Sequence, residues 1–125
     1  MATNTKNFNE SEFTCKCGCG FNIIDQRIID MAQVIRDEVG RPIRVNSGCR
    51  CEEHNKASKG VKGSNHTKGL AADLSCEIGP AKLFDTVKKL HAQGKLPQLD
   101  YCIRYKWGVH IDCGGKRKSL WEVRA

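Results

Sequence analysis

The first strong hydrophobic pattern in the chain is a stretch in which apolar residues recur every three or four positions. It begins at Ile24 and ends at Val39. This spacing predicts an amphipathic helix of about fifteen residues with one buried face. Asp25 can cap the start of this helix, and Gly40 followed by Pro42 would end it.

A second helix is predicted from Pro80 to Gly94. Proline suits the first helical turn, and glycine is common just after the last one. Between them, three apolar residues share one face of the predicted helix: Leu83, Val87 and Leu90.

Short apolar runs with alternating or buried character predict four strands. They cover residues 43–46, 70–74, 99–105 and 109–113. The segment 47–69 is polar and glycine-containing, which predicts a long functional loop with a turn of helix at 52–57. Together these elements predict an α+β fold, with helices packed on a small and mostly antiparallel sheet.

A chain of 125 residues suits a single small domain. We assign residues 8–125 to that domain and expect residues 1–7 to form a flexible arm. The composition is that of a globular protein, and no apolar run is long enough to cross a bilayer, so no membrane insertion is expected. The polar start lacks the order of a secretory signal. Synthesis in the cytoplasm is therefore expected, and action outside the cell would need a separate route of release.

The formal net charge of +7 changes this picture only slightly. A basic surface attracts polyanions, and both nucleic acid and the anionic bacterial wall are of this kind. The densest basic run is residues 116–118. Ordinary solubility explains a modest excess of this size equally well.

Three residues form a candidate metal site: His66 in the polar loop, Asp73 in a predicted strand, and His110 in another. Because neighbours on a strand alternate between faces, Asp73 points away from its apolar neighbours, and His110 and Asp112 point out together. A carboxylate among apolar strand residues needs a partner, and a divalent metal would supply one.

Two histidines and one carboxylate form a common catalytic zinc shell, with a fourth position left for water. The spacing alone does not establish such a site. A loop histidine, a hydrogen-bonded strand histidine and a salt-bridged aspartate would give the same pattern.

The sequence motifs around these residues resemble those of the M15 family of zinc peptidases. The resemblance is closest to the small phage and bacterial D-Ala-D-Ala carboxypeptidases and L-Ala-D-Glu endopeptidases of that family. The resemblance runs from about Phe8 to Trp121. It rests on four sequence motifs: Ser11 to Cys19, Ser47-Gly48-x-Arg50, Ser64-x-His66-x-x-Gly69-x-Ala71-x-Asp73, and Val109-His110-Ile111-Asp112. It implies an M15/hedgehog-like fold with one catalytic Zn²⁺ on His66, Asp73 and His110.

The resemblance also implies roles for residues near the metal. Arg50 would stabilise the developing negative charge or grip a substrate carboxylate, and Ser64 would shape the loop and contact substrate. Several family members carry an acid where this chain has Trp107. Asp112 is then the candidate general base, with orientation of a ligand histidine as the alternative, and Asp100 is a weaker candidate.

Eight cysteines are a high number for this length. Cys15, Cys17 and Cys19 would face one side of an extended segment. Joined by one of Cys49, Cys51 or His54, they could hold a structural zinc, although packing thiols are the alternative. His54 is otherwise expected to be structural, and His91 to be solvated or half-buried.

The sequence thus predicts a zinc-dependent peptidoglycan hydrolase that resembles an endolysin and cleaves the stem peptide. We expect it to act as a monomer at the cell wall or in the periplasm, and either a phage or its host could encode it. One alternative is a catalytically silent zinc module that binds wall peptide or a protein partner. Another is a zinc protein that binds nucleic acid. The chain lacks a recognition-helix signature and clustered aromatic residues, so no nucleic-acid partner is expected.

Overall fold

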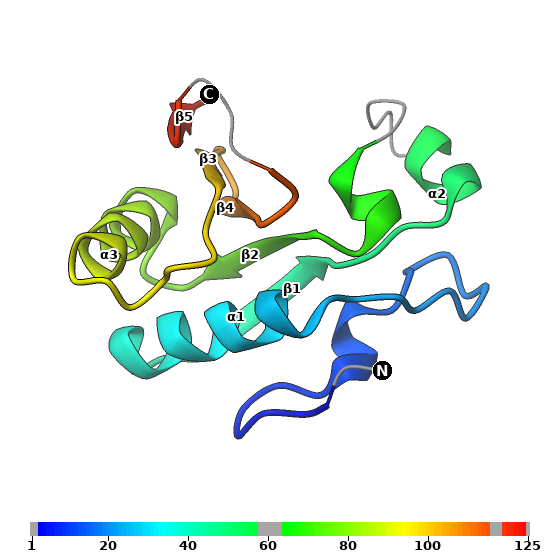
Figure 1. Ribbon diagram of the computed structural model, residues 1–125, viewed down its shortest axis with the longest axis horizontal. Coiled ribbons are helices and arrows are strands. Elements are labelled where there is room, and N and C mark those ends of the chain that lie inside the picture. The colour runs from blue at the N-terminus through cyan, green and yellow to red at the C-terminus, as the bar shows by residue number, and fades with distance from the viewer. Residues whose placement is uncertain (1–2, 58–63, 116–118, 125) are drawn as a thin grey trace.

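The computed structural model describes residues 3–57, 64–115 and 119–124. Within these ranges, helices pack on a five-stranded, mostly antiparallel sheet, so the predicted α+β class is confirmed (Figure 1). The α-helices are α1 (Gln26–Val39), α2 (Glu52–Ala57) and α3 (Pro80–Ala92), and two short 3-10 helices are η1 (Glu10–Phe13) and η2 (Asn65–Lys68). The strands are β1 (Ile43–Ser47), β2 (Ala71–Cys76), β3 (Tyr101–Arg104), β4 (Val109–Asp112) and β5 (Trp121–Val123).

Helix α1 begins and ends where the sequence predicts. The Asp25 carboxylate accepts a hydrogen bond from the backbone N–H of Arg27, which caps the first turn. Gly40 follows the last turn with a φ of 70°, a left-handed conformation that glycine adopts at little cost. The buried residues of α1 recur at helical spacing and form its inner face: Ile28, Ile29, Met31, Ala32 and Ile35.

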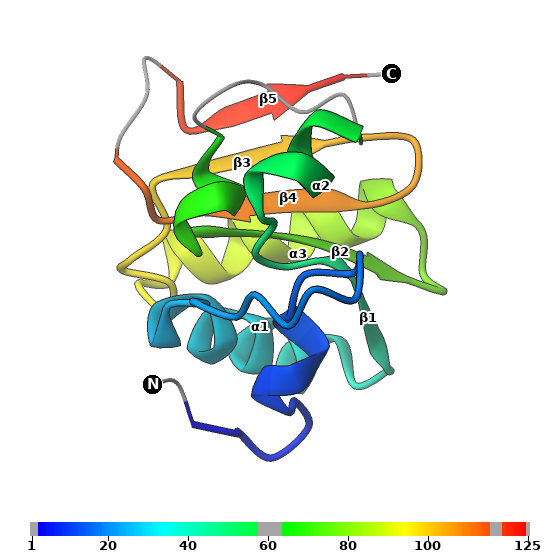
Figure 2. The same cartoon turned by 90° about the vertical axis from the view of Figure 1, so that its right-hand side faces the viewer.

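The strand order is β1-β2-β4-β3-β5, and the three pairings among β1, β2, β4 and β3 are antiparallel. One face of this sheet carries the apolar residues of β2 and β4 that join the core with α1 and α3, namely Ala72, Leu74, Val109 and Ile111. The other face lies beneath η2 and α2, as the turned view in Figure 2 shows. The second face holds the alternate residues of the same strands, including Asp73 and His110.

Strand β5 is the strand that the sequence analysis does not predict. It pairs in parallel with β3, so that Cys102 lies opposite Trp121. The Tyr101 hydroxyl donates to Glu122 at 2.7 Å and links the two strands further. The basic run 116–118 precedes this strand and lies outside the described residues, as do residues 58–63 of the long loop.

The N-terminal segment contacts α1. Thr3 N–H donates to the Gln26 side chain, and Thr5 and Asn7 both donate to the Gln33 side chain. The domain boundary at residue 8 and the flexibility of the arm stay predictions. None of the described helices combines the length and the hydropathy needed to span a membrane.

Candidate metal centre

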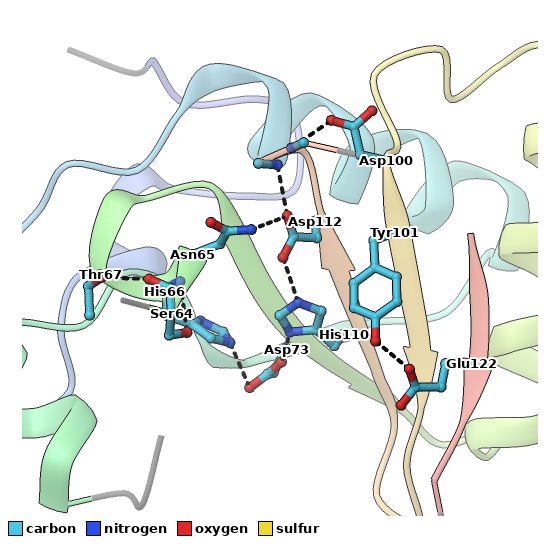
Figure 3. A network of polar contacts seen from close by, with 12 residues as sticks. Ser64, Asn65, His66, Thr67, Asp73, Asp100, Tyr101, His110, Asp112 and Glu122 are labelled. Atoms are coloured by element: carbon cyan, nitrogen blue, oxygen red, sulfur yellow. Dashed lines mark hydrogen bonds and ion pairs between the residues drawn. The ribbon is translucent and has the colours of Figure 1, made fainter. Parts of the chain in front are cut away.

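Three residues that are far apart in the sequence meet on the second face of the sheet (Figure 3). Asp73 and His110 are register partners on β2 and β4, and His66 comes from η2. His66 Nε2 lies 3.4 Å from Asp73 Oδ2, and His110 Nδ1 lies 2.9 Å from Asp73 Oδ1. One donor atom from each residue lies within 4.8 Å of the others, which suits one shared cation.

The short helix η2 holds His66 in place through its two ends. Ser64 Oγ accepts from the His66 backbone N–H at 3.3 Å, and Gly69 ends the helix with a φ of 70°. A Cβ at Gly69 would lie 2.1 Å from the backbone oxygen of Ile23, so only glycine fits this close approach. Gly69, the first residue of the Gly-x-Ala-x-Asp motif, therefore allows the close turn that joins η2, which carries His66, to β2.

The histidine tautomer follows from a backbone contact. His66 Nδ1 lies 2.7 Å from the carbonyl oxygen of Gly48. Because a carbonyl only accepts, Nδ1 carries the hydrogen, and Nε2 turns a free lone pair toward Asp73. A metal ligand needs such a lone pair.

His110 has a carboxylate at each ring nitrogen. Its Nδ1 faces Asp73, and its Nε2 lies 2.9 Å from Asp112 Oδ2. Asp112 Oδ1 in turn accepts from Asn65 Nδ2 at 2.8 Å and from the Gly114 backbone N–H at 2.7 Å. The Asp112 side chain is 1% exposed, and both of its oxygens are occupied. These surroundings favour the orienting role for Asp112, and its role as the general base stays a prediction.

The electrostatics agree with a cation site at Asp73. Burial alone would raise the pKa of Asp73, but the close contacts with the rings of His110 and His66 outweigh this effect and hold the pKa well below its usual range. Asp112 likewise has a lowered pKa, because hydrogen bonds from His110 and Gly114 outweigh burial. Both groups are therefore carboxylates at neutral pH and can balance a bound cation.

Arg50 reaches the same carboxylate from the loop after β1. Its guanidinium donates to Ser47 Oγ at 3.0 Å, to Asn55 Oδ1 at 3.2 Å and to Asp73 Oδ2 at 3.2 Å. Its backbone N–H donates to the His66 carbonyl at 2.9 Å. Arg50 thus contacts two of the three residues of the cluster, and the roles that the resemblance implies for it stay predictions.

The site opens into a cleft of about 470 Å³. Its lining residues come from the loop before α1, from β1 and α2, from β2, and from the β3–β4 turn: Lys16, Asn46, Ser47, Arg50, His54, Asp73 and Trp107. His54, which the sequence analysis treats as structural, therefore faces the same space as Arg50 and Asp73. Trp107 is 42% exposed and stacks on Tyr105 with ring centres 5.0 Å apart.

The remaining predicted residues lie outside the metal cluster. Ser64 contacts η2 through its side chain, and its contact with substrate stays a prediction. Asp100 accepts from the Gly115 backbone N–H at 3.0 Å. His91 packs edge-on against Trp121. Asn65 donates to Asp112 and is a residue of the site that the sequence analysis missed, although it lies directly before His66 in the recognised motif.

The cysteines divide into two groups. Cys15, Cys17 and Cys19 meet Cys51, and the four sulfurs lie within 4.8 Å of one another. Cys49 is instead buried, and its thiol donates to the backbone carbonyls of Phe13 and Phe21. The other three cysteines lie in β2, in β3 and directly after β4: Cys76, Cys102 and Cys113. All eight thiols are free.

Two imidazoles and one carboxylate converge in this α+β domain, and the carboxylate lines an open cleft. This is the ligand set of a mononuclear zinc hydrolase. The Peptidase M15 family model matches residues 6–112. The chain therefore belongs to the M15 peptidase family, which confirms the resemblance, and it is a metallopeptidase by this membership together with its His-Asp-His site. A comparison with curated proteins found no match.

Proposed function

We propose that this chain is a zinc-dependent peptidase that hydrolyses a bond in the stem peptide of bacterial peptidoglycan. The observation that carries the proposal is the His66, Asp73 and His110 cluster at a cleft whose other charged residues are basic. Lys16 and Arg50 line this cleft, and Asp73 is the acidic residue among the lining side chains. Such a cleft suits a peptide that carries carboxylates beside the scissile bond, as stem peptides do.

The donor set fits zinc, since two neutral imidazole nitrogens and one carboxylate oxygen converge there. The chemistry that zinc supplies at such a centre is polarisation of the scissile carbonyl and a lowered pKa for water. Asp112 keeps the His110 ring in its binding orientation and tautomer, and the Gly48 carbonyl does the same for His66.

Arg50 meets the negative charge that develops on the carbonyl oxygen of the substrate. The N–H groups that Ser47, Asn55 and Asp73 do not use remain for this contact. Donors that are already oriented before the reaction contribute most, because they need not reorganise as the charge develops.

His54 is the cleft residue best suited to move a proton between the attacking water and the leaving amine. It stands on α2 in the same cleft as Arg50 and Asp73. Histidine is the side chain that gains and loses a proton near neutral pH. Trp107 occupies the position where several family members have an acid, and its indole can only donate a hydrogen bond.

The chain would act as a monomer, without a nucleic-acid partner or membrane insertion. It would be made in the cytoplasm and would reach the wall or periplasm by a separate route of release. Its role would be that of an endolysin, encoded by a phage or by its host.

Digestion of purified muropeptides with the zinc-loaded protein tests the proposal, with mass spectrometry of the products. Loss of a terminal D-Ala would identify a carboxypeptidase, and cleavage after L-Ala would identify an endopeptidase. The His66→Ala variant is the control and should leave all muropeptides intact. If the zinc-loaded wild type also leaves them intact, the proposed function is wrong.

A second candidate is a catalytically silent zinc module that binds wall peptide. The tryptophan at position 107 favours it, because the exposed ring lies in the cleft and replaces an acid. This candidate predicts that muropeptides bind to the zinc-loaded protein, with an affinity that depends on Trp107, and that they are recovered uncleaved.

A further inference from the structure

Four cysteine side chains converge in a second cluster, separate from the His-Asp-His site. Three come from the loop 15–19 and one from the start of α2. The Cys15 and Cys17 sulfurs lie 3.4 Å apart, and they lie 3.8 Å and 3.7 Å from the sulfur of Cys51. Cys19 completes the group within the same 4.8 Å limit.

These separations are those of ligands around one ion. A disulfide would bring two sulfurs to about 2.05 Å, far closer than any pair here. With Zn–S bonds of about 2.3 Å, the sulfurs of a tetrahedral site lie roughly 3.8 Å apart. An iron–sulfur cluster would insert iron and sulfide between the cysteine sulfurs and hold some pairs farther apart than 4.8 Å.

The backbone around the cluster is shaped to present sulfurs inward. Gly18 and Gly20 flank Cys19 and have φ angles of 86° and 80°, left-handed conformations that glycine adopts at little cost and that turn the chain beside the cluster. Three backbone N–H groups then donate to sulfurs at 3.4 Å: Cys51 to Cys15, His54 to Cys51, and Phe21 to Cys19. Such donors stabilise thiolates, the form that binds metal.

We propose that Cys15, Cys17, Cys19 and Cys51 bind a structural Zn²⁺, separate from the catalytic centre. The residues beside the four cysteines indicate the role of this ion. Lys16 lies between two of its ligands, Arg50 directly precedes Cys51, and His54 donates its backbone N–H to the Cys51 sulfur. All three of these residues line the cleft. The ion would therefore tie the loop before α1 to the segment after β1 and fix one wall of the cleft.

Metal counting on the intact chain tests this inference. Protein purified with zinc should contain two zinc ions per chain. Cys51→Ser and His66→Ala should each contain one, and a variant with both changes should contain none. Cys76→Ser is the matched control, since this half-buried cysteine lies outside the cluster, and it should retain two. Cys17→Ser serves as a second variant at an exposed ligand if Cys51→Ser does not fold.

Cobalt substitution distinguishes the two centres. Cobalt in the cysteine site should give thiolate-to-cobalt charge-transfer absorption in the near ultraviolet, which His66→Ala should keep and Cys17→Ser should lose. A wild type with one zinc, a Cys17→Ser protein that keeps two, cysteines found in disulfides, or the absorption of bound iron would each overturn the inference. Failure to cleave muropeptides would leave these metal counts unchanged, so the two proposals fail separately.

Discussion

His110 Nε2 lies 2.9 Å from Asp112 Oδ2, and the opposite nitrogen of the same ring faces Asp73. The Asp112 carboxylate is held in turn by Asn65 and by the backbone of Gly114. With a cation bound between Nδ1 and Asp73, the Asp112 carboxylate would select the tautomer of His110 with its hydrogen on Nε2 and a lone pair on Nδ1, because a carboxylate only accepts. The Val-His-Ile-Asp motif thus places the proposed ligand His110 and a carboxylate that contacts its ring two residues apart on the same face of β4.

Asp112→Asn is expected to weaken zinc binding more than it impairs the chemical step. An amide NH₂ that faces Nε2 would favour the His110 tautomer with its hydrogen on Nδ1, which cannot bind metal through that nitrogen. Zinc affinity should fall by ~10–100-fold, and excess zinc should restore activity. Competition with a chelating dye measures the affinity, and Asp100→Asn is the matched control. Unchanged zinc affinity with a turnover loss of ~100-fold or more would instead identify Asp112 as the general base.

Removal of the catalytic metal is expected to abolish activity. Alanine at His66, Asp73 or His110 removes one of three convergent donors, and each variant should lose one zinc and all measurable turnover. His91→Ala is the control, because that ring packs on Trp121 away from the cluster. Prolonged dialysis against a chelator should have the same effect on the wild type, with recovery on added zinc. Full activity in the dialysed, zinc-free protein would rule out zinc catalysis.

His54→Gln should leave both zinc ions bound and alter the pH dependence of turnover. Glutamine keeps the size and a hydrogen-bond donor but cannot carry a proton. We expect kcat to fall at least ~100-fold, with loss of the limb of the pH profile that belongs to this group. His91→Gln is the control for a general effect of losing a histidine. A profile that keeps its shape, with kcat reduced evenly, would assign His54 a structural role.

The sequence predicted those features that local rules determine. Asp25 and Gly40 define α1 because capping is a property of adjacent residues. The shared face of Asp73 and His110 follows from strand alternation, and their pairing across β2 and β4 confirms it. These local rules do not predict contacts between segments that are far apart in the sequence. Cys51 joins the thiols from 36 residues away, and nothing in its neighbourhood distinguishes it from Cys49.

Strand β5 shows the same limit. It has three residues, too few for a hydrophobic period, and it forms because the edge of β3 is available for parallel pairing. The catalytic role that we propose for His54 was missed for a related reason. Its position in the cleft depends on how α2 packs, which the spacing of residues along the chain does not reveal.

Asp25→Ala should destabilise the fold by about 1 kcal/mol at neutral pH, because it removes the cap of α1. The hydrogen bond from Arg27 lowers the pKa of Asp25 in the folded state. Its contribution is therefore fully present above the unfolded pKa of about 3.9 and is lost as the pH falls through the lower folded pKa. Urea unfolding of wild type and variant at several pH values measures this difference.

The difference between the Asp25→Ala variant and the wild type should shrink at the acidic end of the series. Acid also releases zinc from both proteins, so only the difference between them is compared. Asp85→Ala is the control at an exposed position of α3, and it should change stability by less than about 0.5 kcal/mol. A variant that remains equally destabilised in acid would mean that the charge of Asp25 contributes nothing.

Arg50→Lys is expected to reduce turnover strongly in a protein that remains folded. The planar guanidinium contacts Ser47, Asn55 and Asp73 at once, and a single ammonium cannot reproduce that geometry. Loss of charge stabilisation in the transition state should lower kcat by about 100-fold. Arg44→Lys, at an exposed position of β1, is the matched control and should leave kcat and KM unchanged.

The kinetic constants of Arg50→Lys separate three roles of the arginine. A change mainly in kcat indicates stabilisation of the developing oxyanion, and a change mainly in KM indicates a grip on a substrate carboxylate. Weaker zinc binding would show that the contact with Asp73 is the one that matters, since that carboxylate is one of the proposed ligands. Activity within a factor of about two of wild type would remove Arg50 from the catalytic machinery. The same purified variant serves for all three measurements, so a folding defect would appear in each of them and could not be mistaken for one role.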